Sequence, residues 1–320
     1  MNKKDILTYD EEKQLSVEER KEYYMELREY LKNIRTPLPE KILTRIRELL
    51  NRKLVREAID LVKGYELMVT GRENIPQTPV IYASTHQDYN DHFNIVLSIP
   101  EHAIILNTNT VTPAFKMIMG FNGIIYVNRK LEESRFNSKL KLMRTILNGK
   151  SVIIFPEGTY NCSPNKLLLP LHMGAIDIAR KTGTPIVPVV QEYTYYPDED
   201  DYKKIVKSCH VHFGKPIYVH ASDSLSDKKE ELQEKLATIR YFLMEEKGLF
   251  SREGITPMEY RNYLKSRLET WKSIKVDYQE EKKFIHGYGS EQYVFSHINA
   301  VPIGDDGVFP KDYTSKKLTL

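Results

Sequence analysis

The 320-residue sequence has little cysteine, no long hydrophobic run and no large excess of either charge. Its two cysteines, Cys162 and Cys209, form no Cys-x-x-Cys pair. This excludes a thiolate metal cage and is typical of a reducing compartment. The 47 basic and 44 acidic residues leave a net charge of +3. So small a charge argues against a protein that binds nucleic acid through bulk electrostatics, and we expect no nucleic-acid partner.

The apolar stretches are too short and too often interrupted to predict a transmembrane helix. The most apolar long stretch, residues 103–128, contains Lys116 and several Asn and Thr residues, which make a poor bilayer span. The N-terminus is highly charged and lacks the apolar core of a signal peptide. We therefore expect a cytoplasmic protein that lies peripherally on the cytosolic face of a membrane.

The first segment, residues 1–63, is predicted to form a helical region. Within it, residues 40–62 have apolar positions at helical spacing and a separate basic face, which consists of Lys41, Arg45, Arg52 and Arg56. A basic amphipathic helix is typical of an element that binds a membrane surface. A solvated helix packed on the main domain explains the pattern equally well.

Residues 64–250 alternate short apolar runs with helical stretches. Strands are expected at 66–69, 80–84, 103–106, 123–127, 152–155, 186–190, 210–213 and 217–219. Helices are expected at 91–98, 113–119, 132–147, 172–181 and 227–246. This alternation predicts an α/β domain with a mixed central sheet flanked by helices. Residues 251–320 are predicted to be a C-terminal extension, and the sequence does not indicate their role.

The densest polar cluster, residues 85–92, directly follows the strand expected at 80–84. Side chains at the carboxyl end of such a strand project into the crevice where α/β proteins bind ligands. His86 lies in the turn, and Asp91 in the next helix can fold back to hold one imidazole nitrogen while the other accepts a proton. The spacing permits a general-base pair, although an isolated His-x4-Asp is more often a turn and a helix cap.

The same cluster also permits a metal site. The side chains that would act as nitrogen and oxygen ligands for zinc or iron are those of His86, Asp88, Asp91 and His92. Such a site would suit a metal-dependent hydrolase. The chain has no Gly-x-Ser-x-Gly elbow and no Cys placed like a protease nucleophile. A non-catalytic module that binds lipid or a carrier is a third alternative.

Three later segments follow this cluster in order. They are Gly123-Ile124-Ile125-Tyr126-Val127-Asn128-Arg129, Phe155-Pro156-Glu157-Gly158-Thr159 and Ile186-Val187-Pro188-Val189. Together with the His-x4-Asp they resemble the four-block signature of the PlsC-type glycerolipid acyltransferases, whose best-known members are the 1-acylglycerol-3-phosphate acyltransferases. The resemblance extends over residues 65–248.

The resemblance implies transfer of a fatty acyl group from acyl carrier protein or coenzyme A to a lysolipid hydroxyl. It implies no acyl-enzyme and no metal or organic cofactor. His86 would be the general base, and Asp91 would fix its tautomer. The residues that the resemblance assigns to substrate binding are Gly123, Asn128, Arg129, Glu157, Gly158 and Thr159.

The chain departs from the family pattern at cationic positions. Tyr160 stands where the third block usually has Arg, and Met173 where a Lys is frequent. Each charged hydrogen bond lost to a phosphate costs about 1.5–3 kcal/mol. We therefore predict a lysoglycolipid or another hydroxyl- or amine-bearing molecule as an alternative acceptor to lysophosphatidic acid. The expected partners are the acyl thioester, the lysolipid and a membrane surface.

Overall fold

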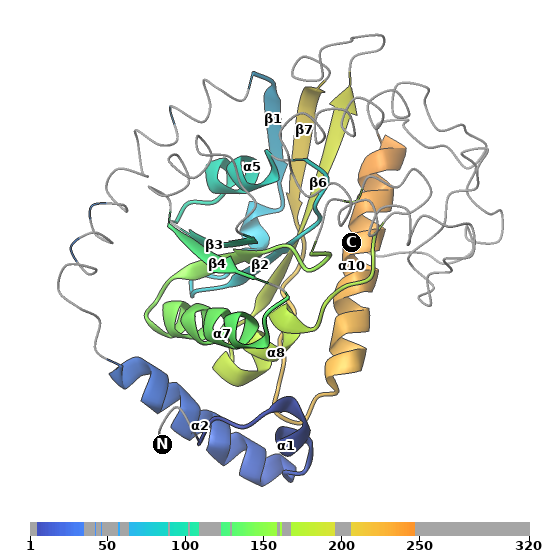
Figure 1. Cartoon of the computed structure of the whole chain (residues 1–320). Coiled ribbons are helices and arrows are strands. Elements are labelled where there is room, and N and C mark those ends of the chain that lie inside the picture. Colours follow the sequence, from blue (N-terminus) through green and yellow to red (C-terminus); the bar gives the residue numbers. More distant parts are fainter. Residues whose placement is uncertain are drawn as a thin grey trace, which may run out of the picture.

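The structure, a computed structural model, describes residues 5–34, 64–88, 90–101, 103–108, 123–128, 130–158, 161, 168–195 and 206–246, and the single positions 42, 46 and 57. These residues form one seven-stranded sheet with helices on both faces (Figure 1). The predicted α/β class with a mixed sheet is therefore confirmed. The helix expected at 113–119, most of the basic segment 40–62 and the extension 251–320 lie outside the described residues.

The strands are β1 (Glu66–Thr70), β2 (Ile81–Ser84), β3 (Ala103–Thr108), β4 (Ile124–Val127), β5 (Ser151–Ile154), β6 (Ile186–Tyr195) and β7 (Val206–Phe213). Their order in the sheet is β1-β7-β6-β2-β5-β3-β4. Only β6 and β7 pair antiparallel; the other neighbours are parallel. The prediction of a strand at 217–219 is wrong, because Ile217 makes only an isolated bridge to Ile186.

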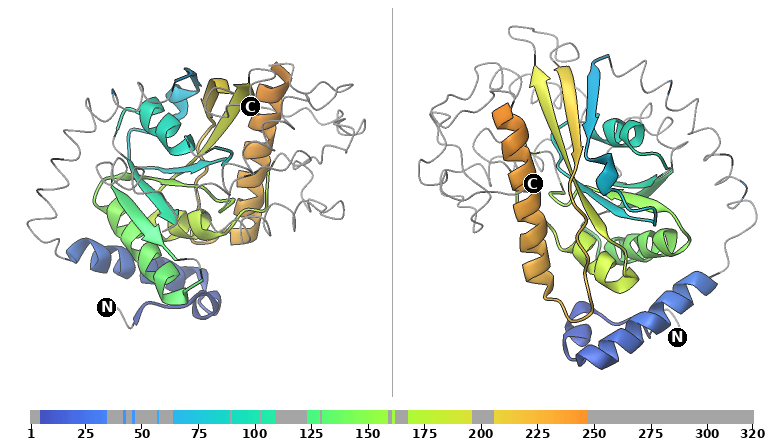
Figure 2. Two further views of the ribbon diagram at one scale, coloured as in Figure 1. Left: turned by 45° about the horizontal axis from the view of Figure 1, so that its top comes forward. Right: turned by 180° about the vertical axis from the view of Figure 1, so that it is seen from behind.

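The helices are α1 (Tyr9–Lys13), α2 (Val17–Asn33), α5 (Asp91–Ser98), α7 (Glu132–Leu147), α8 (Gly174–Thr182) and α10 (Leu225–Glu246), with a 3-10 turn η3 (Arg72–Asn74). Helices α7, α8 and α10 cover one face of the sheet, and α5 covers the other (Figures 1 and 2). Helix α2 packs outside α7 and α8. Reciprocal capping boxes begin α1 and α2, because Thr8 and Glu11, and likewise Ser16 and Glu19, satisfy each other's backbone N–H groups.

The central strands β2 and β5 are buried along their whole length. Ile81 and Ala83 of β2 point into the core under α7, α8 and α10, whereas Tyr82 points into the core under α5. Burial on both faces explains why these strands are continuous apolar runs in the sequence. The polar cluster that follows β2 therefore emerges from the centre of the sheet.

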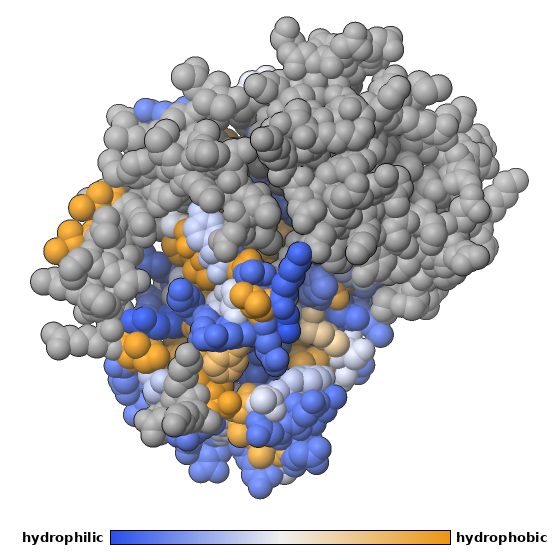
Figure 3. Space-filling view, in the orientation of Figure 1, coloured by the Kyte–Doolittle hydropathy of each residue, from blue (hydrophilic) through white to orange (hydrophobic). Residues whose placement is uncertain are grey.

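The described surface mixes polar and apolar residues on the face that Figure 3 shows. Within the described part of the chain, no helix has the length and apolar composition that crossing a bilayer requires.

Candidate active site

The turn after β2 brings His86 and Asp91 together. The imidazole Nδ1 of His86 lies 2.8 Å from Oδ2 of Asp91, which is the first residue of α5. Both residues are buried, and 8% of the His86 surface remains exposed. Because the Asp91 carboxylate accepts a hydrogen bond from Nδ1–H of His86, the neutral imidazole carries its basic lone pair on Nε2.

The Asp91 carboxylate is held by donors from three further groups. Its Oδ2 accepts the backbone N–H groups of Gln87 at 2.6 Å and Asp88 at 2.9 Å, and its Oδ1 accepts the hydroxyl of Tyr193. Complete burial raises the pKa of Asp91 to about 6, and these hydrogen bonds oppose that rise. At neutral pH the carboxylate is therefore mostly ionised and can orient and stabilise an imidazolium at His86.

Glu157 fixes the backbone of the same turn. It follows β5, the neighbour of β2, and its Oε1 accepts the backbone N–H of His86 at 3.0 Å. Its Oε2 accepts the N–H of Leu169 at 2.8 Å. The carbonyl of His86 in turn accepts the N–H of Asn161 at 2.6 Å. Burial raises the pKa of Glu157 to about 7, while the Leu169 hydrogen bond and Arg240 lower it.

Two rings limit the movement of the His86 imidazole. Phe155 stacks on it, with ring centroids 4.1 Å apart and planes inclined by 25°. His92 meets it edge-on, with centroids 5.5 Å apart. The imidazole is therefore held by a ring stack as well as by its bond to Asp91.

The other residues that were predicted for the site do not all lie near the pair of His86 and Asp91. Gly158 follows Glu157 in the turn after β5, and its N–H donates to Phe155 O at 3.0 Å. Asn128 follows β4 at the edge of the sheet, where its side chain accepts the N–H of Lys130. Gly123 precedes β4, at the opposite end of the strands from His86, so the structure does not bring it to the site. Arg129, Thr159 and Tyr160 lie outside the described residues.

The four residues of the alternative metal site do not converge as ligands. Asp91 is engaged by His86, Tyr193 and two backbone groups, and Asp88 Oδ1 accepts the N–H of Asn90 at 2.9 Å. Within the described residues, no group of three or more His, Cys, Asp or Glu side chains is arranged to hold a metal ion.

Sequence reasoning missed four side chains that support the pair. Tyr193 and Glu192 belong to the part of β6 beyond its predicted end at 190, and the polar run Gln191-Glu192-Tyr193-Thr194 is the signal that could have found them. Gln87 and Arg240 complete the set. Arg240 lies in a helix that was correctly predicted, but nothing in the sequence shows that it is buried.

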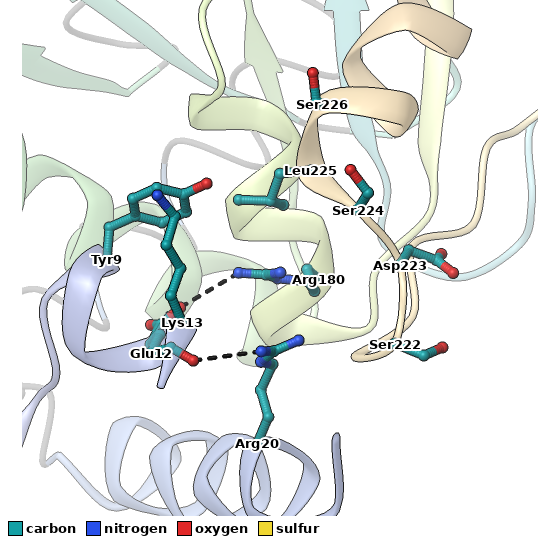
Figure 4. A pocket seen from close by; sticks show the side chains of 10 residues that line it. All are labelled: Tyr9, Glu12, Lys13, Arg20, Arg180, Ser222, Asp223, Ser224, Leu225 and Ser226. Atoms are coloured by element: carbon teal, nitrogen blue, oxygen red, sulfur yellow. Dashed lines mark hydrogen bonds and ion pairs between the residues drawn. The ribbon is translucent and has the colours of Figure 1, made fainter. Parts of the chain in front are cut away.

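A hollow of about 300 Å³ lies elsewhere, between α1, α2, α8 and the start of α10 (Figure 4). At this hollow Arg180 pairs with Glu12, with 3.4 Å between Nη2 and Oε2. Lys181 also pairs with Glu12. Helix α8 leads into the amino end of β6, so this cluster lies at the opposite end of the sheet from His86.

Comparison with known proteins finds similarity to acyltransferases. Residues 66–192 match the model of the family described as acyltransferase. The chain is 30% identical over 176 residues to the chloroplastic 1-acyl-sn-glycerol-3-phosphate acyltransferase BAT2 of Brassica napus, covering 53% of this chain and 51% of the relative. It is 29% identical over 160 residues to the 1-acyl-sn-glycerol-3-phosphate acyltransferase of Borreliella burgdorferi, covering 49% and 60%.

The chain thus spans between half and three fifths of the length of these two relatives. A solved structure, the 1-acyl-sn-glycerophosphate (LPA) acyltransferase PlsC of Thermotoga maritima, is 19% identical with a TM-score of 0.49. The alignment covers 72% of this chain and 99% of that one.

Proposed function

We propose that this chain, whose residues 66–192 are a domain of the acyltransferase family, transfers a fatty acyl group from a thioester to the hydroxyl of a lysolipid. The observation that carries the proposal is the 2.8 Å contact between His86 Nδ1 and Asp91 Oδ2, at the carboxyl end of the central strand β2. The donor would be acyl carrier protein or coenzyme A, and the acceptor a lysophosphatidic acid-like or other lysolipid.

The residues of the site support a reaction without an acyl-enzyme. His86 Nε2 takes the proton of the acceptor hydroxyl as its oxygen attacks the thioester carbonyl, and Asp91 stabilises the resulting imidazolium. The C–S bond then breaks, the imidazolium returns its proton to the departing thiolate, and an ester and a thiol remain. The acceptor hydroxyl is the nucleophile, so the protein needs no nucleophilic Ser or Cys.

The finer assignments belong to the same proposal. Asn128, Arg129, Glu157, Gly158 and Thr159 would bind or shape the site for the polar head of the acceptor. The enzyme would work at the cytosolic face of a membrane, where it would meet a lysolipid acceptor, and it would need no cofactor. Gly123 would contribute through the packing of β4, because a Cβ at this position would lie 2.8 Å from Ile104 Cδ1.

A thioester-release assay tests the proposal. Acyl carrier protein and coenzyme A donors are offered with phosphorylated and neutral lysolipids, and His86→Ala is compared with His220→Ala, a control at an exposed histidine. We expect acylated lysolipid from the wild type, and a loss of about 10²–10⁴-fold in His86→Ala only. Intact thioester with every acceptor, or full activity of His86→Ala, would overturn the proposal. Release with water as acceptor, together with stoichiometric zinc, would favour the hydrolase.

A further inference from the structure

We propose that Arg240 is a positioning residue for the acyl transfer, and that it acts on His86 through Gln87 and Glu192. This inference rests on the proposed function. Arg240 comes from α10, more than 150 residues from His86 in the sequence, and only 1% of its surface is exposed. It contributes a charged group in direct contact with the turn that carries the catalytic pair.

The contacts form a continuous chain from α10 to the His86 turn. Arg240 Nη2 donates to Gln87 Oε1 at 3.1 Å, and Arg240 Nε donates to Glu192 Oε2 at 3.2 Å. The Gln87 amide nitrogen donates in turn to the carbonyl of Gln191. The backbone N–H of Gln87 donates to Asp91, as described above. Gln87 therefore joins the buried ion pair at its side chain to the catalytic pair at its backbone.

Strand β6 explains why the two supports reach the turn from opposite faces. Alternate residues of a strand point to opposite faces of the sheet. Tyr193 points to the α5 face, where it meets Asp91, and Glu192 points to the face that α10 covers, where it meets Arg240. The His86 turn is thus held between a tyrosine on one side and an arginine on the other.

The geometry requires a guanidinium rather than a positive charge alone. Nε and Nη2 of one planar group reach two acceptors that belong to different elements, the turn after β2 and strand β6. A lysine ammonium is a point charge on a flexible stem and lacks this rigid fork. Arg240→Lys therefore keeps the positive charge but loses the planar fork that reaches both acceptors. The variant thus distinguishes an effect of positioning from an effect of charge.

The chain offers a matched control in Arg180→Lys. Arg180 and Glu12 also form a buried guanidinium–carboxylate pair (Figure 4), with 7% and 1% of their side chains exposed, against 1% and 3% for Arg240 and Glu192. This pair lies at the opposite end of the sheet. Both variants should lose thermal stability, but only Arg240→Lys should change the site.

The experiment measures kcat and KM of the full chain by the thioester-release assay and follows the His86 ring nitrogens by ¹⁵N NMR. We expect Arg240→Lys to lower kcat about tenfold or more, since small displacements in an active site cost up to about 10²-fold. KM should change less than about twofold on this view, because the acceptor and donor contacts remain. The His86 resonances should shift in Arg240→Lys and stay unchanged in Arg180→Lys.

Gln87→Met keeps the Arg240–Glu192 ion pair and removes the side-chain hydrogen bonds of Gln87 to Arg240 and to the Gln191 carbonyl. This variant therefore tests the link to the turn if Arg240→Lys does not fold. We expect the same kcat loss and the same shift of the His86 resonances. A wild-type kcat and an unchanged His86 spectrum in folded Arg240→Lys or Gln87→Met would overturn the inference. If the wild type transfers no acyl group, the proposed function fails, whereas the ¹⁵N comparison still tests whether Arg240 positions His86.

Discussion

The backbone N–H of His86 donates to Oε1 of Glu157 over 3.0 Å, although the two residues are 71 positions apart. The other carboxylate oxygen of Glu157 accepts the N–H of Leu169. Glu157 thus ties the turn after β2 to the loop after β5, and its carboxylate is directed at protein backbone. Through this contact the segment Phe155-Pro156-Glu157-Gly158-Thr159 supports the turn that carries His86.

Glu157→Gln should disturb the turn as well as the fold. The side-chain NH2 of glutamine would face one of two backbone N–H donors, so one buried donor loses its acceptor at a cost of about 1–3 kcal/mol. We expect acyl transfer to fall roughly tenfold or more, because the backbone of His86 is no longer fixed. Urea unfolding and the thioester assay measure both effects. Glu234→Gln, at an exposed position of α10, is the control and should behave as wild type.

The difference in stability between the wild type and Glu157→Gln should depend on pH. The pKa of Glu157 is raised from 4.5 to about 7, so between these values the folded state binds more protons than the unfolded one. The contribution of Glu157 to stability is therefore complete below pH 4.5 and is lost as the pH rises through 7. The stability difference, wild type minus Glu157→Gln, should fall by about 1 kcal/mol per pH unit in this window. A constant difference between pH 5 and 7.5 would contradict the raised pKa.

Tyr193→Phe should shift the pH dependence of the reaction. The Tyr193 hydroxyl donates to Asp91 and lowers the pKa of that carboxyl group, which burial raises to about 6. Without the hydroxyl this pKa rises further, and less of Asp91 is ionised at neutral pH. We expect about tenfold less activity at pH 6, with partial recovery at pH 8, in a profile of kcat/KM. The control, Tyr218→Phe, removes an exposed hydroxyl and should leave the profile unchanged.

Two glycines allow backbone strain to be separated from steric overlap. Gly71 and Gly149 both have positive φ angles, +76° and +86°. A Cβ at Gly71 would lie 2.1 Å from Phe213 O, whereas one at Gly149 would meet no atom within 4 Å. Gly149→Ala should therefore cost only the left-handed conformation, about 1–2 kcal/mol. Gly71→Ala should cost about 3 kcal/mol or more in urea unfolding, because strand β7 must also move. Equal losses of unfolding free energy in Gly71→Ala and Gly149→Ala would show that the overlap with Phe213 is relieved without cost.

Local patterns explain what was predictable from the sequence. Six of the seven strands and the helices α5, α7, α8 and α10 follow from the sequence pattern, and each lies within four residues of its predicted limits. Strand β6 is the exception, because its second half carries the polar side chains that line the site. Helix α2 lies inside residues 1–63, for which the sequence predicts only a helical region. The pairing of His86 with Asp91 was also predictable, because the two residues are only five positions apart, on either side of one turn.

The α/β class and the nearness of His86 to Asp91 follow from the sequence alone, because both depend on spacing along a short stretch of chain. Tertiary structure alone decided which distant groups support the pair. Glu157 reaches His86 because β5 lies beside β2, and Tyr193 and Glu192 face opposite ways because β6 alternates its side chains. Arg240 reaches Gln87 because α10 packs on β6. A buried charge of this kind is stable only beside its partners, and those partners lie far away in the sequence.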